Sequence, residues 1–556
     1  MNPSQVDTSE WWRLFASKGL SRAWIIRRQR RILAALAFIL VTIAAVIEVR
    51  SAPIESRLFA NIDRRLRFRV EPGPASGLER SATGPYDERL GFSSLADFAT
   101  RLKQNGYAIT AQARVPRLAR ILGRIGLSGI YHEKAQAGLN IEDRQGVPLF
   151  ESRYPNRIYP EFRSVPPLVV NTLLFIENRK LLDTSHPQRN PAIEWTRLGK
   201  ATLDLAVHAV YRKHSIIGGS TLATQLEKMR HSPSGRTGSV TEKVRQVTSA
   251  SLRSYLDGTD TRETQQRIVL DYLNSIPLAA TPAQGEVIGL GDGLKAWYDA
   301  DFARVNTLLS ADEASLDAHA SLERARAYRE VLALFLALRA PGWYLVRHPD
   351  FLKTQTERYL RGLAANGVIS PHLRDLALRS DPRPRPEPVR EGTANFVSNK
   401  APDAIRSSLL ALLGLDNAYA LDRFDLNVKT TLDRKAQDSA TQFLQGLSDP
   451  AKVAEANLNQ FQLLDSGNPK SVIYSVTLYE QTGGVNQLRV QTDNFDQPLD
   501  INQGTRLQLG STAKLRTLIH YLELVASLHD QYATMSSEQL KKVPVLPGDN
   551  LTTWAL

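Results

Sequence analysis

The sequence contains no cysteine among its 556 residues. This absence excludes disulfides, thiolate metal sites and a cysteine nucleophile, but it does not choose a cellular compartment. No internal repeat is visible. Acidic residues are also comparatively few, with 57 Asp and Glu against 70 Lys and Arg, a net charge of +13. Such a positive field attracts nucleic acid, anionic lipid headgroups or a pyrophosphate, and composition alone does not select among these ligands.

One apolar run near the N-terminus indicates a membrane protein. Residues 32–49 are apolar except for Thr42 and Glu48. As a helix this run would measure about 27 Å, close to the hydrocarbon core of a bilayer. No signal-peptide cleavage site follows it, so we expect a retained transmembrane helix. The run is preceded by a cluster of arginines: Arg27, Arg28, Arg30 and Arg31.

The rest of the chain divides by composition and periodicity. Residues 95–102 have a helical pattern, residues 107–115 alternate like a strand, and residues 168–370 are mostly helical in pattern. The length and the 42% of hydrophobic residues allow several packed domains. We expect a cytoplasmic tail (1–31), a transmembrane helix (32–49), a juxtamembrane spacer or docking domain (51–130), a mainly α domain (131–380), a Pro-rich linker with a short helix (381–425) and a C-terminal α/β part (426–556).

A first cluster of candidate residues lies at the C-terminal end of a predicted apolar helix. The segment LLFIENRKLLD, residues 173–183, places Glu177 at the end of an apolar surface. A carboxylate in that setting is a candidate general base. Taken alone, such a glutamate is more often a solvated helix residue.

A second cluster combines a glycine pair with a helix start. In IIGGSTLATQLEKMR, residues 216–230, Ser220 and Thr221 follow two glycines and can cap a helix. A helix N-terminus presents unpaired N–H groups and a positive dipole that favour an anion. Gln225 and Lys228 follow three residues apart and should share a face of this helix. An ordinary capped helix is the competing interpretation.

Two further clusters are basic. TEKVRQ, residues 241–246, carries Lys243 and Arg245. In QRIVLDYLNSIPL, residues 266–278, Arg267 starts an amphipathic helix that ends at Asn274. Basic groups of this kind could neutralise a pyrophosphate leaving group. Each run on its own is more typical of a solvated helix face.

Taken in order, the four clusters resemble glycosyltransferase family 51, the peptidoglycan polymerases of class A penicillin-binding proteins. Glu177 begins a segment similar to the family's Glu-Asp-x-x-Phe motif, and residues 218–228 resemble its Gly-x-Ser-Thr-x-x-x-Gln motif. Lys243 matches the lysine of Arg-Lys-x-x-Glu. Residues 267–274 are similar to Lys-x-x-Ile-Leu-x-x-Tyr-Leu-Asn. The resemblance covers about residues 135–375.

The resemblance implies a mainly α, lysozyme-like fold and a reaction. The family extends glycan strands from a lipid-linked disaccharide-peptide pyrophosphate, with inversion at the anomeric carbon. Glu177 would be the general base, and a divalent cation, Mg²⁺ or Mn²⁺, would help to hold the departing pyrophosphate. The growing strand, membrane lipid and other envelope proteins would be partners, and nucleic acid would not. The resemblance places the protein in the bacterial inner membrane, with its catalytic part extracytoplasmic. The implied substrate-binding residues are Ser220, Thr221, Gln225, Lys228, Lys243, Arg245, Arg267 and Asn274.

Several positions depart from the family pattern. Asn178 replaces the aspartate of the first motif, and Gln246 replaces the catalytic glutamate of the third. An amide cannot accept a proton or bind a cation as a carboxylate does. Glu242 lies one helical turn before Gln246 and could take its role if the alignment is shifted. Three alternatives therefore stay open: a polymerase, an inactive envelope scaffold that keeps the fold, and a lytic enzyme in which Glu177 is a general acid.

The C-terminal part resembles the beginning of a penicillin-binding transpeptidase domain. VKTTLDRKAQDSA, residues 428–440, is similar to its opening Thr-Thr-Leu-Asp segment, and two strand-like runs flank a hairpin signal at Thr482-Gly483-Gly484. LGSTAKLRT, residues 509–517, resembles the Ser-x-x-Lys motif, with Ser511 as nucleophile and Lys514 as its activating amine. No Ser-x-Asn or Lys-Thr-Gly motif follows. We therefore expect an incomplete α/β domain in which this pair does not function.

Overall fold

A computed structural model describes residues 9–75, 84–195, 220–282, 284–384, 396–460, 464, 467–497, 499–505 and 510–556. Gly218, Gly219 and residues 385–392 of the expected linker lie outside this description. The chain divides into two compact units. One unit comprises Met1–Ala394 with Pro402–Arg434, and the other comprises Asn395–Ala401 with Lys435–Leu556.

The first unit begins with the apolar helix that the sequence predicts. Helix α1 (Ser9–Ser51) includes a stretch, Arg28–Ser51, that is long and apolar enough to cross a membrane. The chain then turns at Ala52, whose φ is 49°, into helix α2 (Pro53–Arg64). The Glu48 carboxylate accepts hydrogen bonds from the first backbone N–H groups of α2, from Ile54 at 3.0 Å and Glu55 at 2.7 Å. Glu48 therefore fixes α2 to the end of α1.

The juxtamembrane segment combines short helices with a small sheet. Strand β1 (Arg69–Pro72) pairs antiparallel with β2 (Ala111–Arg114). Helix α4 (Leu95–Gln104) confirms the helix predicted over residues 95–102, and β2 confirms a strand within residues 107–115. The remaining helices of this segment are α3 (Pro85–Arg89) and α5 (Arg117–Arg124).

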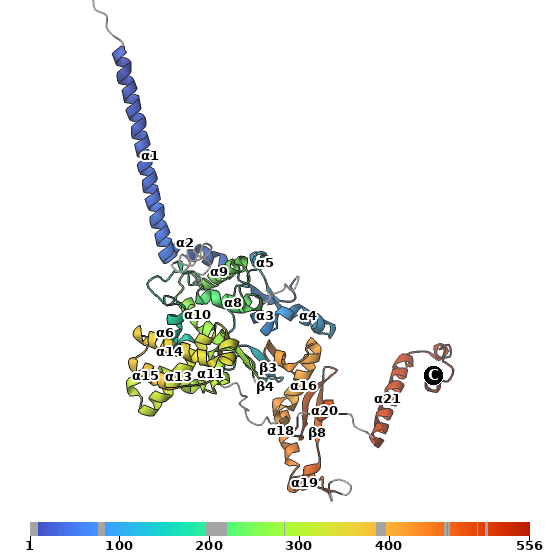
Figure 1. The fold of residues 1–556 in the computed structure, drawn as a ribbon. Helices are drawn as coiled ribbons and strands as arrows, with labels where there is room; N and C mark the ends of the chain where they lie inside the picture. Colours follow the sequence, from blue (N-terminus) through green and yellow to red (C-terminus); the bar gives the residue numbers. More distant parts are fainter. Residues whose placement is uncertain are drawn as a thin grey trace, which may run out of the picture. The chain divides into compact units, whose positions relative to one another are not determined.

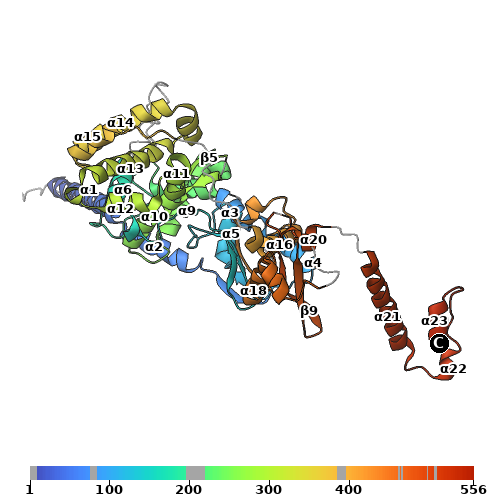
Figure 2. The same cartoon turned by 90° about the horizontal axis from the view of Figure 1, so that it is seen from below.

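Helices form the body of the unit, as the pattern over residues 168–370 predicts. Apolar side chains from α6, α8, α10, α11 and α13 are buried in one large core, and the two views show α13, α14 and α15 side by side (Figures 1 and 2). A short hairpin of β5 (Pro277–Thr281) and β6 (Gly285–Ile288) joins α10 to α11. The helices are α6 (Pro167–Glu177), α8 (Leu222–His231), α9 (Val240–Ser254), α10 (Arg262–Ser275), α11 (Gly289–Tyr298), α12 (Phe302–Ser310), α13 (Ala318–Ala337), α14 (Pro349–Ala365) and α15 (Pro371–Arg379).

A three-stranded sheet joins distant parts of the sequence. Strands β3 (Gly138–Glu142) and β4 (Pro148–Glu151) form the hairpin signalled from Leu139. Strand β7 (Asp425–Lys429) lies parallel to β3 on its other edge. The sheet therefore ties the start of the expected transpeptidase-like part to the start of the expected α domain. Helices α16 (Phe396–Leu413) and α17 (Ala418–Leu421) precede β7, and α16 includes the short helix expected in the linker.

The second unit is built on one β-hairpin. Strands β8 (Ser475–Thr482) and β9 (Val485–Asp493) pair antiparallel, which confirms the predicted hairpin at Gly483 and Gly484. Both glycines have positive φ, 61° and 78°, as such a two-residue turn requires. The helices of this part of the chain are α18 (Arg434–Gly446), α19 (Pro450–Glu455), α20 (Ile501–Gly504), α21 (Ala513–Tyr532), α22 (Ser537–Leu540) and α23 (Asn550–Ala555).

Candidate active site

Glu177 is the last residue of α6. The inward side of that helix is buried in the large core through Val169, Val170, Leu173 and Leu174. Burial of this apolar side anchors the helix, so that its final carboxylate is held half-buried at the edge of the core. The structure thus gives Glu177 the setting that the sequence predicts.

Helix α8 brings an amide to this carboxylate. Thr221 is the N-cap of α8: its side chain accepts a hydrogen bond from the Thr224 backbone N–H, and Thr224 reciprocates. One turn later, Gln225 Nε2 donates to Glu177 Oε2 at 2.8 Å. The cap fixes the start of α8 and, through it, the direction from which Gln225 reaches Glu177.

Tyr272 completes this group, and sequence reasoning did not single it out. Its hydroxyl donates to Gln225 Oε1 at 3.1 Å. Burial of the phenol, together with the charge of Glu177, raises the pKa of Tyr272 well above its ordinary value, so the hydroxyl stays protonated. Tyr272 belongs to the Tyr-Leu-Asn part of the fourth motif, and this was the sequence signal that could have identified it as a site residue. The chain Tyr272–Gln225–Glu177 fixes both ends of the Gln225 amide and orients the carboxylate.

Two lysines lie on the same side of the site. Lys243, on α9, donates to Ser220 Oγ at 2.8 Å, directly before the start of α8. Burial of Lys243 and the positive charge of Lys228 lower the pKa of the Lys243 amine. Two ammonium groups close enough to repel each other form a site whose charge an anion would neutralise. The structure therefore brings Ser220, Lys228 and Lys243 together.

Gln246 lies in a buried polar network rather than beside Glu177. Its Nε2 donates to Ser232 Oγ at 2.8 Å and to Thr237 Oγ1 at 2.9 Å. Ser232 in turn donates to Glu242 Oε1 at 2.6 Å. Glu242 and Gln246 thus share a helix face, as their spacing predicts, and both meet the Ser232 hydroxyl. Gln246 is only 3% exposed, and its amide links α9 by hydrogen bonds to the segment that follows α8.

Two of the expected substrate-binding residues have other partners. Arg245 forms an ion pair with Glu242, with 3.6 Å between Nη1 and Oε2, and its guanidinium packs against Gly126. Asn274 is buried and makes two hydrogen bonds to the backbone of Tyr159, one to its N–H and one to its carbonyl, at 2.9 and 2.8 Å. The structure therefore assigns Asn274 to positioning α10 rather than to substrate contact.

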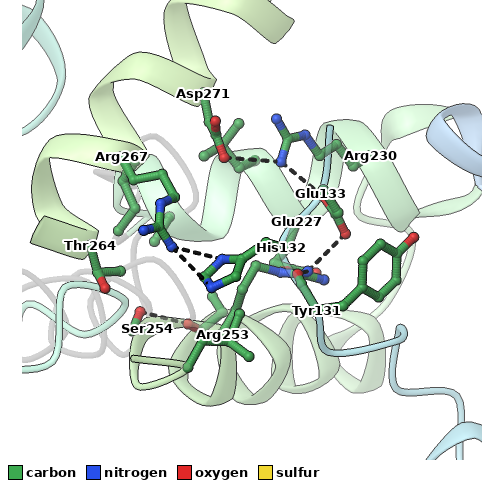
Figure 3. Close-up of a pocket in the computed structure, with 15 residues that line it drawn as sticks. Tyr131, His132, Glu133, Glu227, Arg230, Arg253, Ser254, Thr264, Arg267 and Asp271 are labelled. Carbon is green, nitrogen blue, oxygen red and sulfur yellow. Dashed lines mark hydrogen bonds and ion pairs between the residues drawn. The ribbon is translucent and has the colours of Figure 1, made fainter. Parts of the chain in front are cut away.

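Arg267 lines a pocket on the opposite side of α8 (Figure 3). Its guanidinium contacts His132 at 2.7 Å and Asp257 at 2.8 Å. Ala223, Leu226, Glu227 and Arg230 of α8 face this pocket, whereas Gln225 and Lys228 lie on the other side of the same helix. The structure does not bring Arg267 to the Glu177 site, so its expected role in substrate binding is not supported by its position.

A buried charge cluster that joins α8 and α9 forms part of the wall of this pocket. The Glu133 carboxylate forms ion pairs with Arg230 and Arg253, both at 2.8 Å, and Figure 3 shows these three residues together. The His231 ring also contacts Glu133, at 2.6 Å. Burial would lower the pKa of His231, but Glu133 and Asp87 outweigh it and raise this pKa to about 9. The same cations hold the pKa of the Glu133 carboxyl well below its usual range despite its burial. A fully paired cluster of this kind fixes the relative placement of the two helices.

A divalent cation would find few protein ligands among the described residues of this site. Among the residues that the structure describes, no group of three His, Asp or Glu side chains is arranged to hold a metal ion. Glu177 is one carboxylate, and Gln246 directs its amide hydrogens at two hydroxyls. Magnesium sites in proteins commonly use one or two carboxylates together with substrate phosphates. The divalent cation therefore stays a prediction.

The Ser511 and Lys514 pair lies in the second unit. Ser511 is exposed within the turn Gly510–Thr512, and Lys514 is exposed in the first turn of α21. No hydrogen bond joins the two side chains among the described residues. That this pair does not function stays a prediction.

Comparison with known proteins identifies the helical body. Residues 145–361 match the family model described as Transglycosylase. No curated protein matches the chain. The matched segment contains Glu177, Gln225, Lys228, Lys243 and Tyr272. Residues 145–361 therefore form a transglycosylase domain, the glycosyltransferase family 51 domain of class A penicillin-binding proteins.

Proposed function

We propose that this protein is a single-pass inner-membrane glycosyltransferase that polymerises peptidoglycan strands from a lipid-linked disaccharide-peptide pyrophosphate. One observation carries the proposal: an oriented carboxylate and a pair of ammonium groups lie on the same side of α8. Inverting transfer from a pyrophosphate needs both a base and an anion site. The transglycosylase family of the segment supports the same reaction.

Glu177 would take the proton from the 4-hydroxyl of the acceptor sugar. The hydroxyl oxygen then forms a bond to the anomeric carbon of the growing strand, on the face opposite the leaving group. The bond from that carbon to the pyrophosphate oxygen breaks, and its electron pair leaves on the lipid pyrophosphate. Gln225 would keep the Glu177 oxygens aimed at the acceptor while this happens.

Lys228 and Lys243 would bind the departing pyrophosphate. An anion between them relieves their mutual repulsion, so the interaction strengthens as negative charge develops on the leaving oxygen. A divalent cation would add to this neutralisation, and it would be held by the phosphate oxygens of the substrate.

A second candidate function rests on Gln246. Where the family has a carboxylate, this chain has a buried amide engaged with Ser232 and Thr237. A protein that binds lipid pyrophosphate through Lys228 and Lys243 without turning it over would be an envelope scaffold. The oriented Glu177 favours the enzyme over the scaffold.

Incubation of the detergent-solubilised full chain with lipid-linked disaccharide-pentapeptide separates the two functions. An enzyme gives polymer that is digested by a muramidase. A scaffold gives no polymer but retains the substrate in a binding assay, and Lys228→Met with Lys243→Met abolishes that retention. A chain that neither polymerises nor retains the substrate contradicts both.

A further inference from the structure

Helix α5 has two very different sides. Leu118, Ala119 and Leu122 pack into a small core that α2 and α9 share with it. The opposite side is exposed and carries Arg117, Arg120, Arg124 and the isoleucines 121 and 125, at the spacing of one helix face. The helix contains no acidic residue. Ile121 and Ile125 are thus exposed beside three arginines, an apolar and positive surface of the kind that a bilayer with anionic headgroups can bind.

Helix α2 repeats this arrangement directly beside the apolar helix. Ile54, Arg57 and Leu58 are exposed on one face, with Ile54 at 68% and Leu58 at 55%. The two acidic residues of α2 are turned away from solvent: Asp63 is 1% exposed, and Glu55 bonds to the Asn190 side chain. Burial raises the pKa of Asp63 to about 6 despite the nearby Arg67. The exposed side of α2 is therefore apolar and positive.

We propose that the exposed sides of α2 and α5, here called the arginine–isoleucine face, bind the surface of the bilayer through its anionic lipid headgroups. The proposal rests on α1 crossing that bilayer. Glu48, three residues before the end of α1, caps α2, so α2 starts where the membrane helix ends. The bilayer that α1 crosses lies next to this face. A bilayer surface can bind both kinds of side chain, because isoleucine enters the headgroup boundary and arginine pairs with anionic headgroups.

The face is coupled to the candidate active site through α9. Residues of α2 and α5 share their core with Leu252 of α9, and Gly126, just after α5, lies against the guanidinium of Arg245. A Cβ at Gly126 would come within 2.8 Å of Arg245 Cζ, so the two segments are in close contact. Docking of the face would hold Lys243, two residues before Arg245, near the bilayer from which a lipid pyrophosphate projects.

The absence of cysteine makes the test direct, because one introduced cysteine labels at one place. Full-length Ile121→Cys carries a polarity-sensitive fluorophore in nanodiscs of phosphatidylcholine with or without phosphatidylglycerol. Nitroxide lipids should quench it strongly in the anionic discs. Leu322→Cys, 52% exposed on α13, is the matched control and should be quenched weakly.

The charge contribution is tested by Arg117→Glu with Arg124→Glu. Each arginine near an anionic surface is expected to favour the docked state about fivefold. The double variant should therefore lower the docked-to-undocked ratio by at least about 25-fold and remove the dependence on phosphatidylglycerol. The proposal is overturned if the fluorophores at positions 121 and 322 are quenched equally. It is also overturned if quenching at position 121 is the same with and without phosphatidylglycerol. The readout is independent of polymerisation, so a failed polymer assay leaves it unaffected.

Discussion

Gln246 gives the sharpest test of how the third motif works in this chain. In Gln246→Glu, the two hydrogen bonds donated by the amide to Ser232 and Thr237 are lost. The single Ser232 hydrogen is already donated to Glu242, so a carboxylate at position 246 would face an oxygen lone pair. The new charge would also lie near the carboxylate of Glu242, in a site with 3% exposure.

The magnitude follows from these contacts. Two net hydrogen bonds contribute about 1 kcal/mol each, and a buried charge whose one hydroxyl donor is Thr237 costs about 1–3 kcal/mol more. A loss of about 4 kcal/mol lowers the melting temperature of a domain of this size by about 8–16 °C. Differential scanning fluorimetry of the full chain in detergent measures this shift, and the polymer assay accompanies it. We expect lower stability and no gain in polymerisation.

The swapped variant, Glu242→Gln with Gln246→Glu, is the matched control. The amide then lies at position 242 and can donate to Ser232, whose hydroxyl turns its hydrogen to the carboxylate at 246. Most of the lost melting temperature should return. A Gln246→Glu single variant with unchanged melting temperature and several-fold higher polymerisation would refute this reasoning, because the side chain at position 246 would then act on the substrate.

Three further outcomes are expected. Lys243 loses its proton at a lower pH than an ordinary lysine, in part because Lys228 repels its charge. Lys228→Met should therefore move the alkaline limit of polymerisation to higher pH. An unchanged limit would contradict the repulsion between the two lysines. The pKa of His231 is raised from 6.5 to about 9, so its stabilisation, on the order of 3 kcal/mol, is present below pH 6.5 and lost as the pH rises through 9. His231→Gln should flatten the melting temperature across that range, whereas an equally steep decline would exclude His231 as the cause. Fluorescent β-lactam should label the chain near background, and a strong band absent from Ser511→Ala would show that the second unit assembles an acyl-transfer site.

Sequence patterns predicted local features well because their causes are local. The apolar run of α1, the capped start of α8 and the glycine turn between β8 and β9 each depend on residues a few positions apart. The family motifs assigned Glu177 and Gln225 separate roles, as base and as substrate-binding residue, and the 2.8 Å hydrogen bond between them was not among the predictions.

Long-range contacts were not predictable in the same way. The pairing of β3 with β7 joins residues nearly three hundred positions apart, and no pattern within either strand specifies its partner. Arg267 and Asn274 lie on one helix and matched one motif, yet their side chains diverge, one to His132 and the other to the Tyr159 backbone. Which face of a helix meets which neighbour is decided by packing. For the same reason, the role of Tyr272 became clear only once α8 and α10 were placed together.

Glu177→Gln tests the central claim most directly. The substitution keeps the size of the side chain and removes its ability to accept a proton, so polymerisation of lipid-linked disaccharide-pentapeptide should fall by about a hundredfold or more. The melting temperature should change little. Glu161→Gln is the control, because that exposed carboxylate pairs with Arg163 at the protein surface, and the activity of this variant should match that of the unmodified protein. Unchanged polymerisation in Glu177→Gln would contradict the proposal that Glu177 is the general base of this glycosyltransferase.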